Sequence, residues 1–303
     1  MRGFTEADVP DQTGKGFIVT GANTGIGFEV ARVLGERGAR VLLACRDAAK
    51  ADAAIARIKH AMPRADLAFL PLDLADLQSV RAAAELAEKE PRIDALINNA
   101  GVMIPPLMRT KQGFELQFGV NHLGTFALTS LLLPKLAETQ GARVVVTASI
   151  AHRRGKLDWD DLNAERRYDR FGRYAASKLA NALYFFELDR RLRAAGAPVT
   201  AVGCHPGVAA TDLGRHAGIA RILMVLAKLI LNTAAQGAWP ALQAATAPVT
   251  PGGYYGSLGF REMRGESGPA SRTAQAQDPA FARRLWDVSV AMTGIDPGLA
   301  PAA

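Results

Sequence analysis

The feature that most constrains the fold is an alternation of short apolar segments with longer helical ones along most of the chain. We predict strands at residues 17–20, 40–44, 67–70, 93–97, 143–147 and 199–203. Helical periodicity covers residues 26–37, 48–60, 76–88, 114–137, 173–194, 233–245 and 281–292. Strands that alternate with helices pair in parallel through right-handed crossovers. The sequence therefore predicts an α/β fold, a doubly wound parallel sheet of about seven strands with helices on both faces.

The chain has the organisation of a single domain. No linker rich in serine or proline, and no change of composition, divides its 303 residues. We predict one domain over residues 1–303, with an N-terminal tail at 1–14 and a C-terminal extension at 261–303. Segment 209–232 carries a broad apolar face, which we interpret as a lid over the substrate. An ordinary packed helix, an oligomer contact and a peripheral membrane contact are its other interpretations.

Composition excludes several classes of protein. The 36 Lys and Arg residues exceed the 29 Asp and Glu residues, but they are scattered, which argues against a nucleic-acid partner. The longest apolar stretch, at 222–231, contains Lys228 and is shorter than the roughly 18 residues that span a bilayer. Residues 1–16 lack the layout of a signal peptide, and Cys45 and Cys204 suit free thiols in a reducing compartment. We expect a cytoplasmic protein without a transmembrane segment.

A glycine-rich turn joins the first predicted strand to the first predicted helix. It runs from Thr20 to Gly27 with the spacing G-x-x-x-G-x-G. Glycines let the backbone approach a pyrophosphate, and the helix N-terminus supplies free N–H groups and a positive partial charge. We predict a phosphate site here; a turn needed only for tight packing is the alternative. The cofactor contacts assigned to it are Gly21, Asn23, Thr24, Gly25, Ile26 and Gly27.

The end of the second predicted strand discriminates between two dinucleotides. Sites selective for NAD place an acidic residue about 20 residues after the glycine turn, where its carboxylate binds the ribose 2′-hydroxyl. Arg46 occupies the corresponding position here, and a guanidinium can hold a 2′-phosphate through two hydrogen bonds. Asp47 is then left to cap the next helix. We predict NADP in preference to NAD; an exposed Arg46 without a role is the alternative.

A tyrosine and a lysine lie one turn apart in the helix predicted at 173–194. Tyr174 and Lys178 share a helix face, which brings an ammonium close to a phenol and favours the phenolate. Lowering a phenol pKa from about 10 to near 7 takes roughly 4 kcal/mol. Ser149 follows a predicted strand at its carboxyl end, where doubly wound sheets bind ligands. A surface Tyr–Lys pair and a serine that only caps its strand are the alternatives.

These motifs occur in one order: the glycine turn, Asn98 to Gly101, Asn121, Ser149, and Tyr174 with Lys178. In this order they resemble the short-chain dehydrogenase/reductase family, from about residue 15 to about residue 210. The stretches Ala44–Asp47, Ser177–Asn181 and His205–Gly207 are similar to its retinol-dehydrogenase-like branch. Membrane-bound retinoid enzymes of that branch carry a hydrophobic N-terminal anchor, which this sequence does not show, so we do not expect retinol itself as the substrate.

The resemblance implies a role for each matching residue. Tyr174 would act as the acid/base with help from Lys178, and Ser149 would hold the substrate oxygen. Asn121 would hold a water that links the lysine to solvent; an asparagine that only satisfies helix backbone is the alternative. Tyr174 and Lys178 would also contact the cofactor, together with Asp73, Leu74, Asn99, Ala100, Gly101, Pro206, Gly207, Val208 and Thr211.

We therefore predict an enzyme, a nucleotide-binding oxidoreductase that uses NADP and interconverts a carbonyl and an alcohol on a lipophilic small molecule. Tyr174 would move the proton, and the protein is expected to be a homo-oligomer. His122, His152 and His205 lack the spacing of metal ligands, so no metal site is predicted. A non-catalytic NADP(H)-binding regulator and a reductase of a carbon–carbon double bond remain as alternatives.

Overall fold

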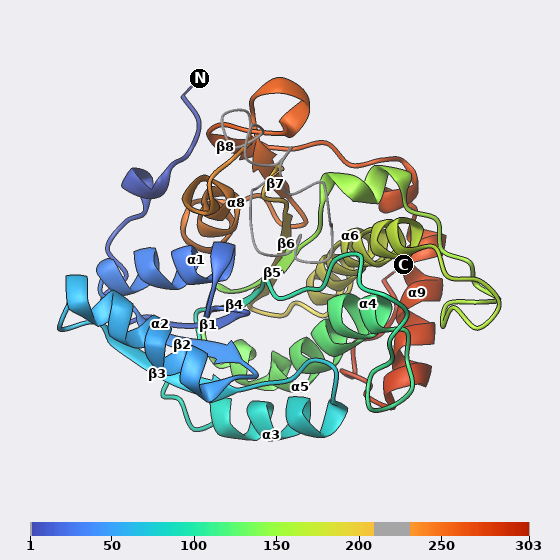
Figure 1. Ribbon diagram of the computed structural model, residues 1–303, viewed down its shortest axis with the longest axis horizontal. Coiled ribbons are helices and arrows are strands. Elements are labelled where there is room, and N and C mark those ends of the chain that lie inside the picture. Colours follow the sequence, from blue (N-terminus) through green and yellow to red (C-terminus); the bar gives the residue numbers. More distant parts are fainter. Residues whose placement is uncertain (1, 209–230, 303) are drawn as a thin grey trace.

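The computed structural model describes residues 2–208 and 231–302. Within these residues one sheet of eight strands has the order β3-β2-β1-β4-β5-β6-β7-β8 (Figure 1). The strands β1 to β7 run parallel, and β8 pairs antiparallel with β7. Their bounds are β1 (Gly16–Thr20), β2 (Arg40–Cys45), β3 (Asp66–Pro71), β4 (Ala95–Asn98), β5 (Ala142–Thr147), β6 (Val199–Cys204), β7 (Tyr254–Ser257) and β8 (Ser267–Pro269).

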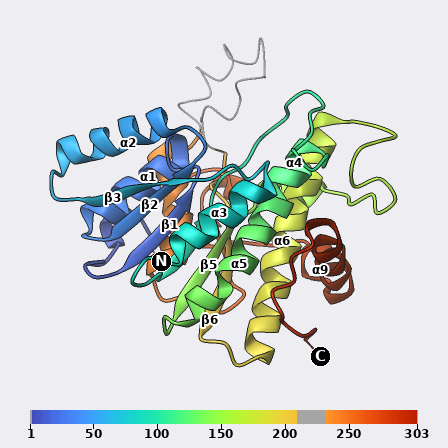
Figure 2. The same ribbon diagram turned by 90° about the horizontal axis from the view of Figure 1, so that it is seen from below.

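Helices cover both faces of the sheet. Figure 1 shows α1 and α8 on one side and α3 and α5 on the other, and Figure 2 shows α9 beside α6. The longer helices are α1 (Gly25–Glu36), α2 (Ala48–Ala61), α3 (Leu77–Ala87), α5 (Thr125–Ala137), α6 (Arg170–Ala194), α8 (Ala234–Thr246) and α9 (Pro279–Thr293). Short helical segments are η1 (Glu6–Asp8), α4 (Leu116–Phe118), η2 (Gly119–Gly124), η3 (Ile150–Arg154), η5 (Phe260–Glu262) and η6 (Gln275–Gln277).

The core consists of two apolar clusters, one on each face of the sheet. Successive side chains of a strand point to opposite faces, so Phe17 and Val19 join the cluster under α1 and α8. Ile18 joins the other cluster, which is formed with α3, α5, α6 and α9. Burial on both faces explains why the strands are continuous apolar runs rather than alternating ones.

The predicted fold class is confirmed, although the described sheet has eight strands instead of about seven. The first six predicted strands and the long helices agree with the structure within a few residues. The strands β7 and β8 were not predicted individually. Both contain only three or four residues and include glycine, so neither has a periodic apolar signal of its own.

The helix predicted at 114–137 is not continuous. It begins as α4, passes through the π-helical turn η2, and continues as α5. A π-helical turn widens the backbone locally and is often found at functional sites. Asn121 lies inside η2 and is fully buried, so the irregular turn is centred on a residue of the predicted catalytic set.

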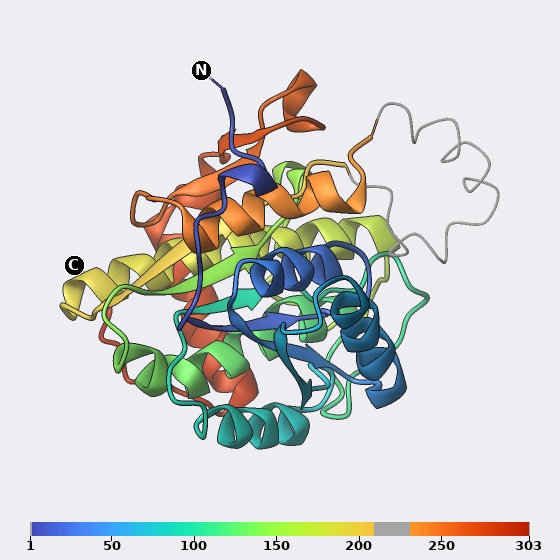
Figure 3. The ribbon, with the colours of Figure 1, turned by 90° about the vertical axis from the view of Figure 1, so that its left-hand side faces the viewer.

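The N-terminal segment, predicted as a tail, is fastened to the far edge of the sheet. The backbone of Phe4 exchanges hydrogen bonds of 2.7 and 2.9 Å with Ser267 in β8. Figure 3 shows this segment passing beside the C-terminal strands. The predicted lid at 209–232 falls outside the described residues except for 231 and 232, and so does Thr211. No helix in the described part of the chain is long and apolar enough to cross a bilayer.

Candidate functional site

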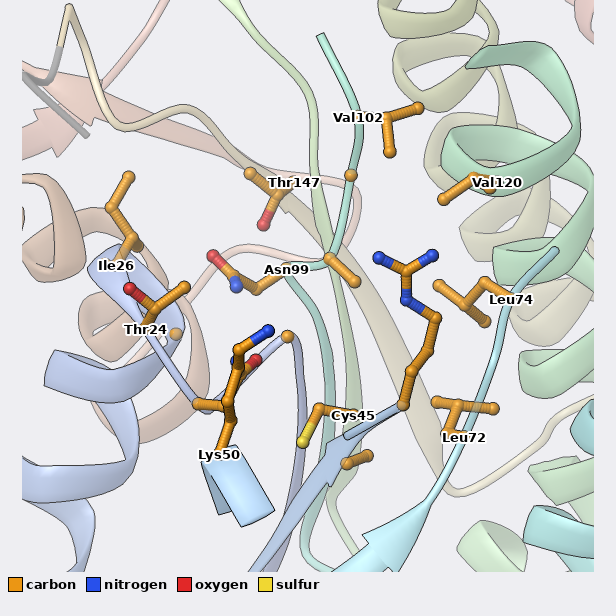
Figure 4. A pocket seen from close by; sticks show the side chains of 18 of the residues that line it. Thr24, Ile26, Cys45, Lys50, Leu72, Leu74, Asn99, Val102, Val120 and Thr147 are labelled. Atoms are coloured by element: carbon orange, nitrogen blue, oxygen red, sulfur yellow. The ribbon is translucent and has the colours of Figure 1, made fainter. Parts of the chain in front are cut away.

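A cavity of ≈ 620 Å³ opens at the carboxyl ends of β1 to β6. In Figure 4, Thr24 and Ile26 lie on one side of it and Leu74 and Val120 on the opposite side. It brings together most of the predicted cofactor contacts, with Tyr174 and Lys178. The predicted residues that line it are Gly21, Asn23, Thr24, Gly25, Ile26, Gly27, Arg46, Asp73, Leu74, Asn99, Ala100, Gly101, Tyr174, Lys178 and Pro206.

The glycine turn is packed too closely for side chains. A Cβ on Gly27 would lie 2.4 Å from the carbonyl oxygen of Gly21 and 2.5 Å from Nδ2 of Asn99. Gly21 itself has a φ of 67°, which an L-residue with a side chain rarely adopts. Asn99 Nδ2 donates to the carbonyl of Thr20 at 2.9 Å, which fastens the turn to the loop after β4. The glycines therefore fix a turn of defined shape at the edge of the cavity.

The N-terminus of α1 differs from those of α2, α3, α6, α8 and α9. Each of these begins at a residue whose side chain accepts a hydrogen bond from the first turn, such as Asp47 or Asp169. The corresponding residue of α1, Thr24, makes no such bond. First-turn N–H groups of α1 are thus left without a side-chain cap beside the cavity, an arrangement that suits an anion.

Basic side chains gather at the end of β2. Asp47 caps α2 by accepting from the backbone N–H of Lys50 at 3.1 Å, and it also pairs with that lysine's Nζ at 3.0 Å. Arg46 is exposed and makes no hydrogen bond or ion pair within residues 2–208 and 231–302. Its guanidinium is therefore free to bind an anion in the cavity, whereas the neighbouring carboxylate is engaged.

Sequence reasoning missed one face of α2. Lys50, Ala53, Ala54 and Arg57 all line the cavity, and their spacing of three, four and seven residues defines one side of a helix. The guanidinium carbon of Arg57 lies 3.6 Å from the centroid of the Phe28 ring. The spacing of these residues could have indicated this face, because α2 begins two residues after Arg46.

Lys178 is buried and lines the same cavity as Arg46. Its side chain donates to the carbonyl of Thr147 at 3.1 Å, and its Nζ lies 6.0 Å from the centroid of the Tyr174 ring. Burial lowers the pKa of Lys178 to about 8. The close approach of the loop after β4 contributes to this burial, because a Cβ on Gly101 would lie 3.5 Å from that Nζ.

This lowered pKa predicts a pH dependence of stability. The unfolded lysine titrates near 10.4, so between a pKa of about 8 and that value the unfolded chain binds more protons. Stability therefore rises with pH in this window, by roughly 3 kcal/mol from this residue. We expect the difference in unfolding free energy, wild type minus Lys178→Met, to increase between about pH 7 and about pH 10.5 in urea titrations. A difference that stays constant with pH would contradict it.

The pKa of Tyr174 is set here by the protein alone. The predicted lowering by Lys178 together with the positive nicotinamide ring concerns the complex with oxidised cofactor and stays a prediction. In the structure burial raises the pKa of Tyr174, and the neighbouring hydroxyl of Ser149 acts in the opposite direction. The protein's own residues therefore keep the phenol protonated at neutral pH, which is the form that donates a proton.

Asn121 is committed to neighbouring groups. Its Oδ1 accepts from the backbone N–H of Val102 at 2.7 Å, and its Nδ2 donates to the carbonyl of Val102 at 3.0 Å. The same Nδ2 donates to Oγ of Ser177 at 2.9 Å. The side chain thus joins η2, the loop after β4 and α6. Its predicted role in holding a water stays a prediction.

Several predicted residues do not line the cavity. These are Asn121, Ser149, Gly207 and Val208, although the Ser149 hydroxyl is close enough to Tyr174 to act on the pKa of its phenol. The three histidines considered as metal ligands have separate partners, which are Ser289 for His122, the carbonyl of Ser149 for His152, and Glu262 for His205.

Comparison with known proteins identifies the family. Residues 15–220 match the sequence profile of the short chain dehydrogenase family. Retinol dehydrogenase 12 of Homo sapiens is 43% identical over 288 residues, which cover 93% of this chain and 87% of that protein. The likeness therefore covers more of the chain than residues 15–220, which match the family profile.

Solved structures agree with this assignment. A crystal structure of an uncharacterized protein from Mycobacterium paratuberculosis is 38% identical, covers 98% of this chain and 100% of that chain, and has a TM-score of 0.83. A short chain dehydrogenase from Escherichia coli CFT073, crystallised with NADPH, is 25% identical over 78% of this chain and 92% of that chain, with a TM-score of 0.62. This chain thus belongs to the short chain dehydrogenase family, on a branch like that of the retinol dehydrogenases, and the predicted NAD(P)-dependent oxidoreductase is confirmed.

Proposed function

We propose that this oxidoreductase uses NADP(H) to interconvert a carbonyl and an alcohol on a lipophilic small molecule, with Tyr174 as the acid/base. One observation carries the proposal: a single cavity joins an uncapped helix N-terminus and Arg46 to Tyr174 and Lys178. The first pair suits a phosphorylated dinucleotide, and the second suits proton transfer at its reacting end.

The residues present fit NADP(H). The turn at Gly27 leaves no room for a Cβ, so the backbone lies open to the cavity at the first turn of α1, where a pyrophosphate would bind. Arg46, with Lys50 nearby, offers positive charge for a 2′-phosphate. The Escherichia coli relative crystallised with NADPH supports the same choice.

The proposed chemistry divides between cofactor and protein. Bound NADPH supplies the hydride for the carbonyl carbon. Tyr174 donates its phenolic proton to the carbonyl oxygen, and the ammonium of Lys178 stabilises the resulting phenolate. Ser149 hydrogen-bonds the same substrate oxygen and fixes its position. In the reverse direction the phenolate accepts the alcohol proton.

Apolar walls support a lipophilic substrate. Val102, Leu116 and Val120 line the cavity, and Phe171, one turn before Tyr174 in α6, is 43% exposed. The similarity to retinol dehydrogenases is consistent with this class. The direct test is oxidation of NADPH, followed by ultraviolet absorbance, across aldehydes and ketones of increasing chain length. Binding of NADPH without turnover on any of them would favour the regulator, and product identification would separate carbonyl from carbon–carbon reduction.

Arg46→Ala is expected to weaken NADPH binding by about tenfold and to leave NADH binding unchanged. Hydrogen bonds to a charged group contribute about 1.5–3 kcal/mol, and about 1.4 kcal/mol corresponds to tenfold in affinity. Fluorescence titration with each cofactor measures the effect. Arg64→Ala is the matched control, because Arg64 is an exposed arginine outside the cavity. Equal affinity of the unmodified protein for both cofactors would refute the assignment.

The homo-oligomeric state and the cytoplasmic location stay predictions. Light scattering of the purified protein measures the first, and fractionation of cells that produce the chain measures the second.

A further inference from the structure

A carboxylate outside the predicted set connects two loops that flank the reacting end of the cavity. Glu262 lies in η5, after β7. Its Oε2 accepts a hydrogen bond from Nη2 of Arg153 at 2.6 Å and lies 3.0 Å from Nε2 of His205. Arg153 belongs to η3, which follows β5, and His205 follows β6. One oxygen atom thus contacts both loops.

The first of these loops carries Ser149. This serine begins η3, and its Oγ accepts from the backbone N–H of Ala151 at 3.2 Å. Its carbonyl accepts from the backbone N–H of His152 at 3.0 Å and lies 2.6 Å from Nδ1 of the same residue. The turn is therefore a compact unit, and Arg153 in the same turn ties that unit to Glu262.

The second loop carries Pro206 and Gly207. The buried ring of His205 accepts from the backbone N–H of Gly207 at 3.1 Å through Nδ1, and it meets Glu262 through Nε2. Because both ring nitrogens are engaged, the ring transmits the position of Glu262 to this turn. Pro206 itself lines the cavity.

The position of Glu262 is fixed from its other side as well. Its Oε1 accepts from the backbone N–H of Ser271 at 3.1 Å and from the hydroxyl of that residue at 2.7 Å. Burial acts to raise the pKa of this carboxyl, but hydrogen bonds from His205 and Ser271 lower it to about 2, so it is ionised at neutral pH. The backbone at Arg261 and Glu262 has φ values of 50° and 61°, which non-glycine residues adopt rarely. Such backbone persists where surrounding contacts hold it.

We propose that Glu262 is a positioning residue that sets Ser149 at the correct distance from the Pro206–Gly207 turn. The inference rests on the proposed function, in which the serine holds the substrate oxygen, and on the predicted contact of Pro206 and Gly207 with the cofactor. Hydride transfer needs the substrate and the cofactor in fixed positions relative to each other. A mutation far from the chemistry that displaces a reacting group by about 1 Å can reduce the rate by roughly 100-fold. Glu262 acts through Arg153 and His205 and does not touch the reacting atoms.

The test is Glu262→Gln, which keeps the size of the side chain and removes its charge. We expect kcat for carbonyl reduction to fall by roughly 10- to 100-fold, while the dissociation constant of NADPH stays nearly unchanged. Hydrogen–deuterium exchange should become faster in residues 149–155 and in residues 205–208 together. Arg153→Gln should make exchange faster in residues 149–155 but not in residues 205–208. This outcome would separate a role of Glu262 in linking the two loops from a general loosening of the fold.

Glu266→Gln is the matched control, because it removes a carboxylate of the same segment whose Oε2 accepts from the backbone N–H of Gly3 at 2.6 Å. It should leave both exchange rates and kcat unchanged. Faster exchange in only one of the two segments after Glu262→Gln, or an unchanged kcat, would overturn the proposal. If the unmodified protein reduces no carbonyl, the proposed function fails, whereas the exchange measurement still decides whether Glu262 links the two loops.

Discussion

Tyr174→Phe is expected to lower kcat for NADPH-dependent carbonyl reduction by about 10²- to 10⁴-fold, the usual contribution of general acid catalysis. The substitution removes one oxygen atom and keeps the ring. Because burial raises the pKa of the phenol, that hydroxyl is protonated at neutral pH, and it lines the cavity together with Lys178. NADPH affinity should change little, since the phosphate turn and Arg46 are untouched.

Steady-state kinetics combined with NADPH titration measures both quantities on the same preparations. Tyr184→Phe provides the control, because Tyr184 lies in the same helix, is buried and does not line the cavity. It should retain the activity of the unmodified enzyme. A Tyr174→Phe enzyme that keeps most of its kcat would eliminate the tyrosine as acid/base, and an unchanged cellular phenotype would favour the regulator.

Gly27→Ala is expected to weaken NADPH binding by about 100-fold, or roughly 3 kcal/mol. The new Cβ would lie 2.4 Å from the carbonyl oxygen of Gly21, whereas an ordinary contact needs about 3.5 Å. That oxygen belongs to the backbone and cannot rotate away, so the turn itself must move. The movement displaces N–H groups from a pyrophosphate, and each hydrogen bond to a charged group contributes about 1.5–3 kcal/mol.

Isothermal titration with NADPH checks this expectation, and circular dichroism verifies that the variant is folded. Gly35→Ala is the control in the same helix, because the closest atom to its Cβ would be the end of the Leu67 side chain, at 3.2 Å, and no backbone atom is among its three nearest neighbours. Alanine also favours a helix over glycine. Equal loss of affinity in both variants would mean that the effect comes from α1 in general and not from the turn.

Most of the fold could be predicted because its signals are local. The apolar runs of β1 to β6 and the periodicity of α1, α2, α3 and α6 reflect burial on two faces of one sheet. The strands β7 and β8 escaped prediction because they are short and include glycine, and their pairing with β6 and with each other, not an apolar run of their own, defines them. The irregular turn η2 was not predicted either. It occurs together with hydrogen bonds from Asn121 to Val102 and Ser177, which are contacts between separate segments of the chain.

The candidate site shows the same difference between local sequence signals and contacts of residues far apart in the sequence. Residues within one motif, such as Gly21 and Gly27 or Tyr174 and Lys178, could be predicted to lie at one site from their spacing together with the family resemblance. Glu262 could not, because its partners Arg153 and His205 lie 109 and 57 positions away in the sequence. The raised pKa of Tyr174 could not be predicted either, since it depends on how deeply the fold buries the phenol.

The pairing of Phe4 with Ser267 has a consequence for biosynthesis. The two ends of this contact are 263 residues apart, so the edge of the sheet stays incomplete until nearly the whole chain has left the ribosome. Chains emerge N-terminal end first, and β1 to β6 can pair before β8 exists. Closing so long a loop costs only slightly more entropy than closing a short one, but such distant contacts slow folding. We therefore expect the first residues to reach their native place last, in the same step that completes the far edge.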